Sequence, residues 1–224
     1  MLSKNNLNIS NGVKVIFDLD YTLLDTAKLH NKLAEIFDKE NYREDYQRFF
    51  KDKGINFDEE KYFEILKSEG RVDEAREKEL KLKLAELLMN MDDYLNPGAV
   101  EALEHFKQAG NKLILMTFGN KKWQELKIKN LSIAKYFSNI IYEDKDKSKS
   151  EYLKALSGTS EEILLINDNL DEAKEMLKIL KRGELHLVDG PYNKELHDSE
   201  KKVRINKLAE LIPEKSETKE LNLR

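Results

Sequence analysis

Apolar residues gather in five short runs that alternate along the chain with segments of helical periodicity. The runs are of strand length and nearly continuous, as expected for strands buried on both faces of a parallel sheet. They are Val13–Phe17, Leu113–Met116, Ile140–Tyr142, Ile163–Ile166 and Leu185–Val188. Amphipathic spacing predicts helices at Ala99–Ala109, Lys121–Lys129, Ser150–Leu156 and Leu170–Leu180. This alternation predicts an α/β fold with a doubly wound, Rossmann-like parallel sheet.

Between the first apolar run and the second, residues 26–94 show helical periodicity only. The candidate helices are Ala27–Lys39, Tyr42–Lys51, Asp58–Lys67 and Val72–Met91. We therefore predict an α/β core formed by residues 1–25 and 95–224, with a helical cap formed by residues 26–94. The cap is dense in aromatic residues, most of which we expect to form its own core.

Composition narrows the possible partners and compartments of this chain of 224 residues. The net charge is −4 with acidic and basic residues interspersed, which favours neither nucleic acid nor a membrane surface as a partner. There is no cysteine, which excludes disulfides, thiolate metal sites and a cysteine nucleophile. The apolar runs are too short to cross a bilayer, and the first residues do not resemble a signal peptide. We expect a soluble, cytoplasmic monomer or homodimer.

The first predicted strand ends in Asp18 and Asp20. Ligands of open parallel sheets bind beyond the carboxyl ends of the strands, so a site is expected here. Two neighbouring carboxylates repel each other unless a cation lies between them or one is protonated. Mg²⁺, a hard cation that prefers oxygen ligands, is the natural partner. Taken alone, the pair is equally compatible with capping of a turn.

Other predicted strands end in polar residues as well. Thr117 and Phe118 follow the second strand, where a hydroxyl and a backbone amide suit phosphate oxygens, although a helix N-cap would by itself be the likelier account of Thr117. The fourth strand leads into Asp168, followed by Asp171 and Glu172, which also suit a helix N-terminus. Lysines follow the third strand. Helix capping alone is an improbable explanation for polar groups at every one of these strand ends.

The ordered set of motifs resembles the haloacid dehalogenase superfamily of hydrolases, from about residue 13 to about residue 190. Phe17–Asp25 is similar to its first motif, Asp-x-Asp-x-Thr after an apolar strand. Thr117 resembles the second motif and Lys149 the third, with Lys147 as the alternative lysine. Asp168 with Asp171 or Glu172 resembles the fourth. The sequence departs from the family pattern at Tyr21, where a small or acidic residue is common, and at Glu172, where Asp is usual.

The resemblance implies a magnesium-dependent phosphatase acting on a small phosphorylated metabolite. Asp18 would be the nucleophile that forms an aspartyl-phosphate, and Asp20 the general acid and base. Mg²⁺ would be held by the Asp18 carboxylate, the Asp20 backbone carbonyl and Asp168. An acid at position 20 favours phosphate esters over carbon–halogen bonds, since halide leaves unprotonated.

The remaining site residues are implied in the same way. Thr117 and the amide of Phe118 would bind the phosphoryl group, and Lys149 would offset its charge. Asp171 and Glu172 would support the site indirectly, through Lys149 or a metal-bound water.

Two alternatives remain open at this stage. A phosphomutase or phosphotransferase of the same family would pass the phosphoryl group to a second hydroxyl instead of water. A non-catalytic phosphate- or partner-binding module would use the same fold without turnover. Release of free phosphate from a simple ester distinguishes the first alternative from a phosphatase.

Overall fold

The computed structural model describes residues 12–143, 150–193, 204–205 and 207–212. Its centre is a six-stranded parallel sheet with the strand order β3-β2-β1-β4-β5-β6. The strands are β1 (Lys14–Phe17), β2 (Lys112–Phe118), β3 (Asn139–Glu143), β4 (Ile163–Asn167), β5 (Glu184–Val188) and β6 (Arg204–Ile205). The predicted doubly wound α/β sheet is confirmed, and only the two-residue β6 was not predicted.

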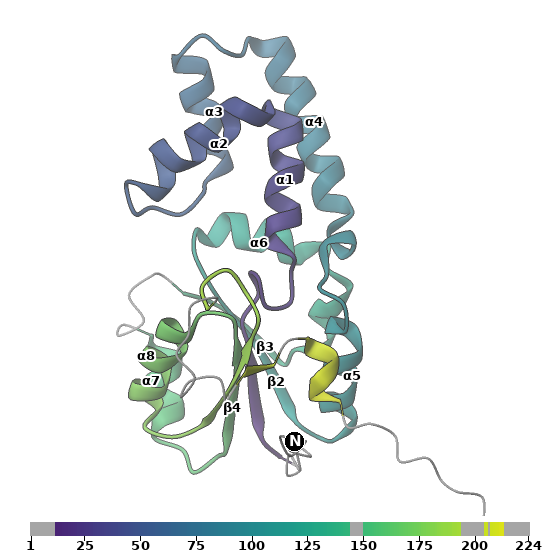
Figure 1. Ribbon diagram of the computed structural model, residues 1–224, viewed down its shortest axis with the longest axis vertical. Helices are drawn as coiled ribbons and strands as arrows, with labels where there is room; N and C mark the ends of the chain where they lie inside the picture. The colour runs from purple at the N-terminus through teal and green to yellow at the C-terminus, as the bar shows by residue number, and fades with distance from the viewer. Residues whose placement is uncertain (1–11, 144–149, 194–203, 206, 213–224) are drawn as a thin grey trace, which may run out of the picture.

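Side chains that alternate along the strands build a hydrophobic layer on each face of the sheet. Val15 and Phe17 of β1 face one layer, and Ile16 faces the other. The first layer packs against α5 and η6, and the second against α7 and α8 (Figure 1). The helices are α5 (Ala99–Gln108), α6 (Lys121–Lys129), η3 (Ser132–Tyr136), α7 (Glu151–Ser157), α8 (Leu170–Leu180) and η6 (Leu208–Leu211).

The segment between β1 and β2 is helical up to α5, as its periodicity predicts. Its elements are α1 (Thr26–Phe37), α2 (Lys39–Asp45), η1 (Tyr46–Lys51), α3 (Glu59–Ser68), α4 (Glu74–Met89) and η2 (Met91–Tyr94). The predicted helix Tyr42–Lys51 is divided between α2 and η1, which is a π-helix. Buried aromatic side chains, among them Tyr42, Phe50 and Tyr62, form the interior of this segment as expected.

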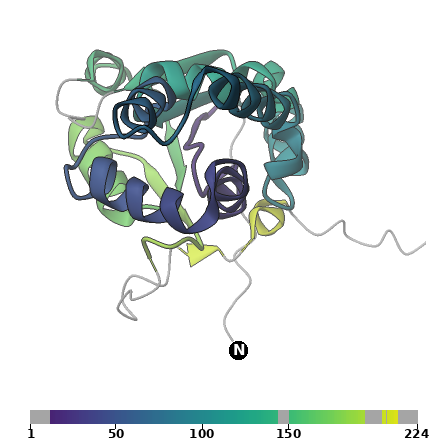
Figure 2. The ribbon, with the colours of Figure 1, turned by 90° about the horizontal axis from the view of Figure 1, so that it is seen from above.

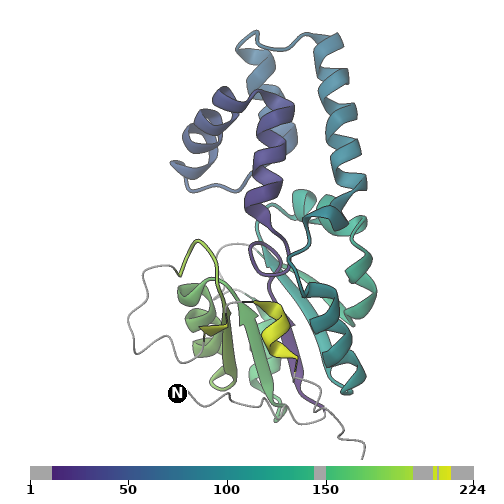
Figure 3. The same ribbon diagram turned by 45° about the vertical axis from the view of Figure 1, so that its right-hand side comes forward.

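We call residues 26–94 the cap, although the division of the chain into cap and core stays a prediction. Its helices stand over the sheet edge at which β1 and β2 end (Figures 1 and 3). Seen from above, α1 to α4 lie across the end of the sheet rather than against either face (Figure 2).

Several helices begin at an Asp or Asn whose side chain accepts a hydrogen bond from a backbone amide of the first turn. These capping residues are Asp25 of α1, Asp58 of α3, Asp73 of α4, Asn120 of α6 and Asn169 of α8. Such caps fix where each helix starts, and three of them lie at the entrance of cap helices. In the described part of the chain, no helix combines the length and the apolar character that a bilayer crossing requires.

Candidate active site

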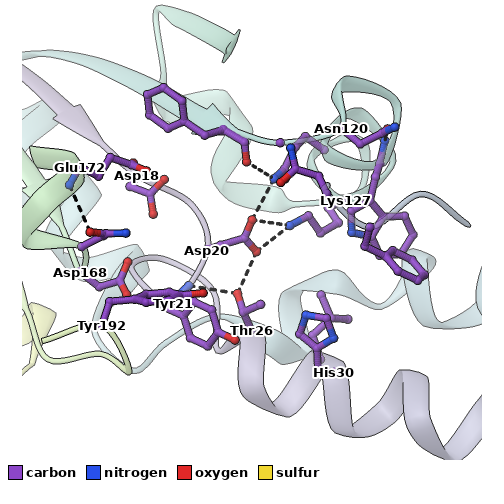
Figure 4. Close-up of a pocket in the computed structure, with 18 of the residues that line it drawn as sticks. Asp18, Asp20, Tyr21, Thr26, His30, Asn120, Lys127, Asp168, Glu172 and Tyr192 are labelled. Atoms are coloured by element: carbon purple, nitrogen blue, oxygen red, sulfur yellow. Dashed lines mark hydrogen bonds and ion pairs between the residues drawn. The ribbon is translucent and has the colours of Figure 1, made fainter. Parts of the chain in front are cut away.

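The carboxyl ends of β1, β2 and β4 open into a cavity of about 250 Å³ that extends beneath the cap (Figure 4). These strands are neighbours in the sheet, so residues far apart in the sequence meet here. Asp18 and Asp20 follow β1, and Asp168 follows β4. Side chains of the cap, among them His30 and Tyr46, line the wall of the cavity opposite these aspartates.

The floor of the cavity carries three carboxylates, those of Asp18, Asp168 and Glu172. Asp18 is buried, and burial together with the charges of Glu172 and Asp168 raises its pKa well above the ordinary value. Burial and the charge of Glu172 also raise the pKa of Asp168 to about 7. Such mutual repulsion costs free energy unless a cation or protons reside there.

Asp20 occupies a different environment, although it lies only two positions from Asp18. Both of its carboxylate oxygens lie within 2.6–2.7 Å of the Lys127 Nζ atom. The Gln124 side-chain amide and the Thr26 hydroxyl also donate to this carboxylate, at 2.9 and 2.8 Å. Burial alone would raise the pKa of Asp20, but the Lys127 ammonium and these donors bring the pKa below its ordinary value. Asp20 is therefore held in its ionised form.

The turn after β1 holds the two aspartates in place. Tyr21 has a φ of 60°, in the left-handed region that bulky residues rarely adopt. The Thr26 hydroxyl accepts a hydrogen bond from the Tyr21 amide at 3.0 Å while it donates to Asp20. The Asn96 side chain donates to the carbonyls of Tyr21 and Thr22, so the return segment from the cap clamps the turn.

A loop after β5 contacts Asp168 and fixes its position. The buried Asn193 amide donates to the carbonyls of Asp168 and Val188, at 2.8 and 2.6 Å. Gly190 packs so closely that a Cβ atom there would lie 2.7 Å from the Asp168 Cβ atom. Only glycine allows this approach without displacing the aspartate.

The other predicted site residues differ in whether they reach the cavity. Thr117 is buried, and its hydroxyl has no hydrogen-bond partner among the described residues. Phe118 and Glu172 line the cavity, whereas Asp171 is exposed and does not. Lys147 and Lys149 both lie outside the described residues, so their prediction stays untested.

The residues on the cavity floor fit a hard divalent cation. The donors are carboxylate oxygens, and Asp168 Oδ2 is buried without a hydrogen-bond partner in the described part of the chain. Among the described residues, no group of three or more His, Cys, Asp or Glu side chains is arranged so that these side chains alone could hold a metal ion. A site completed by a backbone carbonyl and water, as the sequence predicts for Mg²⁺, is compatible with both observations.

Sequence reasoning missed Lys127 and Gln124, which approach Asp20 from α6. A signal was available, because the buried residues of this helix are Trp123, Gln124, Lys127 and Ile128. They share one helical face, so a lysine and a glutamine lie on the side that packs inward. Long polar side chains in such a position need buried partners, and Asp20 is that partner.

Comparison with known proteins identifies the fold and the family. The model of the haloacid dehalogenase-like hydrolase family matches residues 15–187, well over half of the chain. No curated protein sequence matches the chain at a significant level.

Among solved structures, a candidate β-phosphoglucomutase from Thermotoga maritima is 22% identical with a TM-score of 0.58, covering 89% of this chain and 96% of that one. A protein predicted to be a phosphoglycolate phosphatase, from Haemophilus somnus, is 16% identical with a TM-score of 0.55, covering 91% and 98%. At these identities the likeness shows a shared fold. The family match, together with the carboxylates at the ends of β1 and β4, shows that the chain belongs to the haloacid dehalogenase-like hydrolase family.

Proposed function

We propose that this protein is a magnesium-dependent phosphatase that hydrolyses a small phosphate monoester through an aspartyl-phosphate on Asp18. The observation that carries the proposal is the pair of aspartates after β1 in opposite electrostatic environments. Asp18 lies among carboxylates on the cavity floor, and Asp20 is paired with Lys127. The proposal includes a cytoplasmic location, with which the chain's lack of cysteine is compatible.

Asp18 is suited to attack phosphorus because its carboxylate lies at the cavity floor, where an ester would bind. Attack forms an aspartyl-phosphate and releases the alcohol, and water then hydrolyses the acyl phosphate and regenerates the carboxylate. A bound Mg²⁺, held by Asp18, Asp168 and the Asp20 carbonyl, would neutralise charge on the phosphoryl group. The buried Thr117 hydroxyl, which has no hydrogen-bond partner among the described residues, would donate to a phosphoryl oxygen, although Thr117 itself is not one of the residues that line the cavity.

Asp20 is proposed to act as general base for the water that hydrolyses the intermediate, since the Lys127 pair keeps it ionised. For the first step, Asp20 must instead carry a proton for the departing alkoxide. The negative charge of the entering phosphate favours that protonation, because a nearby anion raises the pKa of a carboxyl group. Each role uses the same carboxylate in a different charge environment.

The proposal is tested by phosphate release from p-nitrophenyl phosphate with Mg²⁺ and with a chelator. We expect turnover that requires Mg²⁺, is lost in Asp18→Asn, and falls by about 10²–10⁴-fold in Asp20→Asn. Glu175→Gln, which removes an exposed carboxylate of α8, is the matched control and should retain activity. Turnover that is indifferent to Asp18 would refute the proposed nucleophile.

A phosphomutase would use the same Asp18 chemistry but deliver the phosphoryl group to a second hydroxyl. Free phosphate released at a rate equal to that of alcohol release supports hydrolysis. Phosphate release well below alcohol release, with a phosphorylated acceptor formed, would favour the transferase. A protein that binds phosphate with no turnover at all would favour the binding module.

A further inference from the structure

The floor of the cavity and the wall opposite it are lined by side chains of different chemical character. The floor carries the carboxylates of Asp18, Asp168 and Glu172. The opposite wall is formed largely by apolar and aromatic side chains, which are Leu29, Leu33, Tyr46, Phe57 and Trp123. Since the phosphoryl group must lie at Asp18, the leaving group of the ester lies against this second wall.

The polar groups on the wall are neutral. Asn56 and Asn120 contribute amides. Burial lowers the pKa of His30 to about 4, and its Nδ1 atom lies 3.1 Å from the Tyr42 hydroxyl, so the imidazole is uncharged at neutral pH. These groups can form hydrogen bonds with a hydroxyl or carbonyl but cannot neutralise an anion.

Lys127 is the only cationic side chain among the described residues that line the cavity. Its ammonium contacts both oxygens of Asp20, and its side chain is only 3% exposed. A second anionic group on the substrate would therefore meet no unpaired cation among these residues.

The size of the cavity limits the leaving group as well. A volume of about 250 Å³ lies below the ~300–1,000 Å³ of pockets that enclose drug-sized ligands. After a phosphoryl group occupies the floor, the remaining space suits a single ring or a short branched chain. A flat apolar face would pack against Phe57 and Trp123, whose rings already meet edge to face at 5.1 Å.

We propose that the site selects phosphate monoesters whose leaving group is small, uncharged and carries an apolar or aromatic face, and that it rejects bisphosphates and phosphorylated carboxylic acids. This inference rests on the proposed phosphatase function and specifies its substrate class. The determinants are the apolar and aromatic wall opposite the floor, the neutral amides of Asn56 and Asn120, and the Lys127 ammonium already paired with Asp20.

The test compares benzyl phosphate with 4-carboxybenzyl phosphate, esters matched in ring and reacting bond that differ by one negative charge. We expect kcat/KM for benzyl phosphate to exceed that for the carboxylated ester by at least about 30-fold, since a desolvated charge without a partner is costly. Methyl phosphate, which lacks the ring, should also be poorer than benzyl phosphate. The single tryptophan, Trp123, reports binding separately, through its fluorescence in Asp18→Asn titrated with each ester.

A variant tests the charge argument from the protein's side. Asn56→Lys places an ammonium on the cap wall and should narrow the ratio between the two esters by about tenfold. Ser68→Lys adds the same charge at an exposed position of α3 outside the cavity and should leave the ratio unchanged. Thermal unfolding of both variants verifies that they fold.

The outcomes separate the two proposals. Equal or faster turnover of 4-carboxybenzyl phosphate, or of 2-phosphoglycolate, would overturn the inference on specificity and leave the phosphatase proposal standing. Failure of every ester to turn over with Mg²⁺ would overturn both. An unchanged ratio in Asn56→Lys would refute the assignment of the cap wall as the leaving-group site.

Discussion

At the scale of single residues, the protein shifts the pKa values of two near neighbours, Asp18 and Asp20, in opposite directions. Burial and nearby carboxylates raise the first, and the Lys127 pair lowers the second. Such a divergence separates the roles of two chemically identical groups. The sequence argument offered a cation or a proton to offset the repulsion of these carboxylates, and the resemblance assigned Mg²⁺ to the Asp20 backbone carbonyl rather than its side chain. The partner of the Asp20 side chain is the ammonium of Lys127. The need for a cation therefore falls on Asp18 and Asp168.

Lys127→Met should reduce both stability and activity, because it leaves the Asp20 carboxylate largely buried without its cation. Breaking such a pair costs about 3 kcal/mol, the lower end of the range, since the Asp20 side chain is 26% exposed. We expect kcat/KM for p-nitrophenyl phosphate to fall by about 10²-fold or more. Lys129→Met removes an exposed lysine from the same helix and should alter neither quantity. Wild-type activity in Lys127→Met would contradict the role given to the pair.

Magnesium should stabilise the protein in a pH-dependent way, because Asp18 and Asp168 have raised pKa values. In metal-free protein the folded state binds more protons than the unfolded state between about pH 4 and about pH 7, so stability falls as pH rises through this window. Bound Mg²⁺ would compete with protons for the same carboxylates. Mg²⁺ at 100 times its Kd at pH 8 should add about 2.7 kcal/mol to the free energy of unfolding at that pH. The same Mg²⁺ concentration should add far less near pH 5, where protons occupy the carboxylates.

The measurement is the rise in Tm on adding Mg²⁺ at the two pH values, for wild type and Asp168→Asn. The variant should lose most of the rise near pH 8. A shift that is equal at both pH values, or equally large in Asp168→Asn, would exclude this group as the metal site.

At the scale of elements, short loops set the positions of the catalytic strand ends. Gly190 lies against Asp168 so closely that an added Cβ atom would be 2.6 Å from its Oδ2 atom. Gly190→Ala should displace the aspartate, weaken Mg²⁺ binding and lower kcat/KM by at least about tenfold. Gly158→Ala is the control, since its Cβ atom would meet only the Ala155 carbonyl, at an ordinary 3.5 Å. Similar kinetics for both variants would show that the close approach has no catalytic consequence.

The elements themselves were largely predictable, because buried strands and amphipathic helices leave strong periodic patterns. The predicted strand Leu113–Met116 lies within β2, and the predicted helix Lys121–Lys129 coincides with α6. The π-helix η1 was not predicted, since the sequence pattern of Tyr42–Lys51 fits an ordinary α-helix. In the fold, Tyr46 of η1 contacts His30 and Phe57, which belong to other segments of the chain. The two residues of β6 carry too little pattern to stand out from their polar surroundings.

The candidate site was predictable only where it follows strand ends. Asp18 and Asp168 were found because polar residues directly after apolar runs attract attention. Gln124 and Tyr192 were missed, since one lies within a helix and the other in a loop after β5, and only the fold brings them to the cavity.

At the scale of the whole molecule, several contacts between residues 26–94 and the sheet-bearing part of the chain lie beside the cavity. Asn120, which caps α6 of the core, donates to Asp58, which caps α3 of the cap, at 2.8 Å. The Phe57 ring meets Trp123 edge to face, and Lys122 pairs with Glu60. The capping residues therefore also join α3 to α6.

Asn120→Asp should loosen the cap, because it keeps an N-cap for α6 but sets two carboxylates against each other. We expect KM for p-nitrophenyl phosphate to rise several-fold and backbone amides near Asp58 to exchange hydrogen faster. The double variant Asn120→Asp, Asp58→Asn restores a donor and an acceptor and should recover most of both effects. Failure of the double variant to recover would show that the contact does not govern the cap.

The account as a whole depends on covalent catalysis by Asp18, and the most direct test is to trap the intermediate. Turnover of p-nitrophenyl phosphate is quenched in acid, the protein is reduced with borohydride, and its peptides are analysed by mass spectrometry. Borohydride converts an aspartyl-phosphate to homoserine, so the account predicts homoserine at position 18 that requires substrate and is absent from Asp18→Asn. Turnover without modification at Asp18, or with modification at another carboxylate, would contradict it.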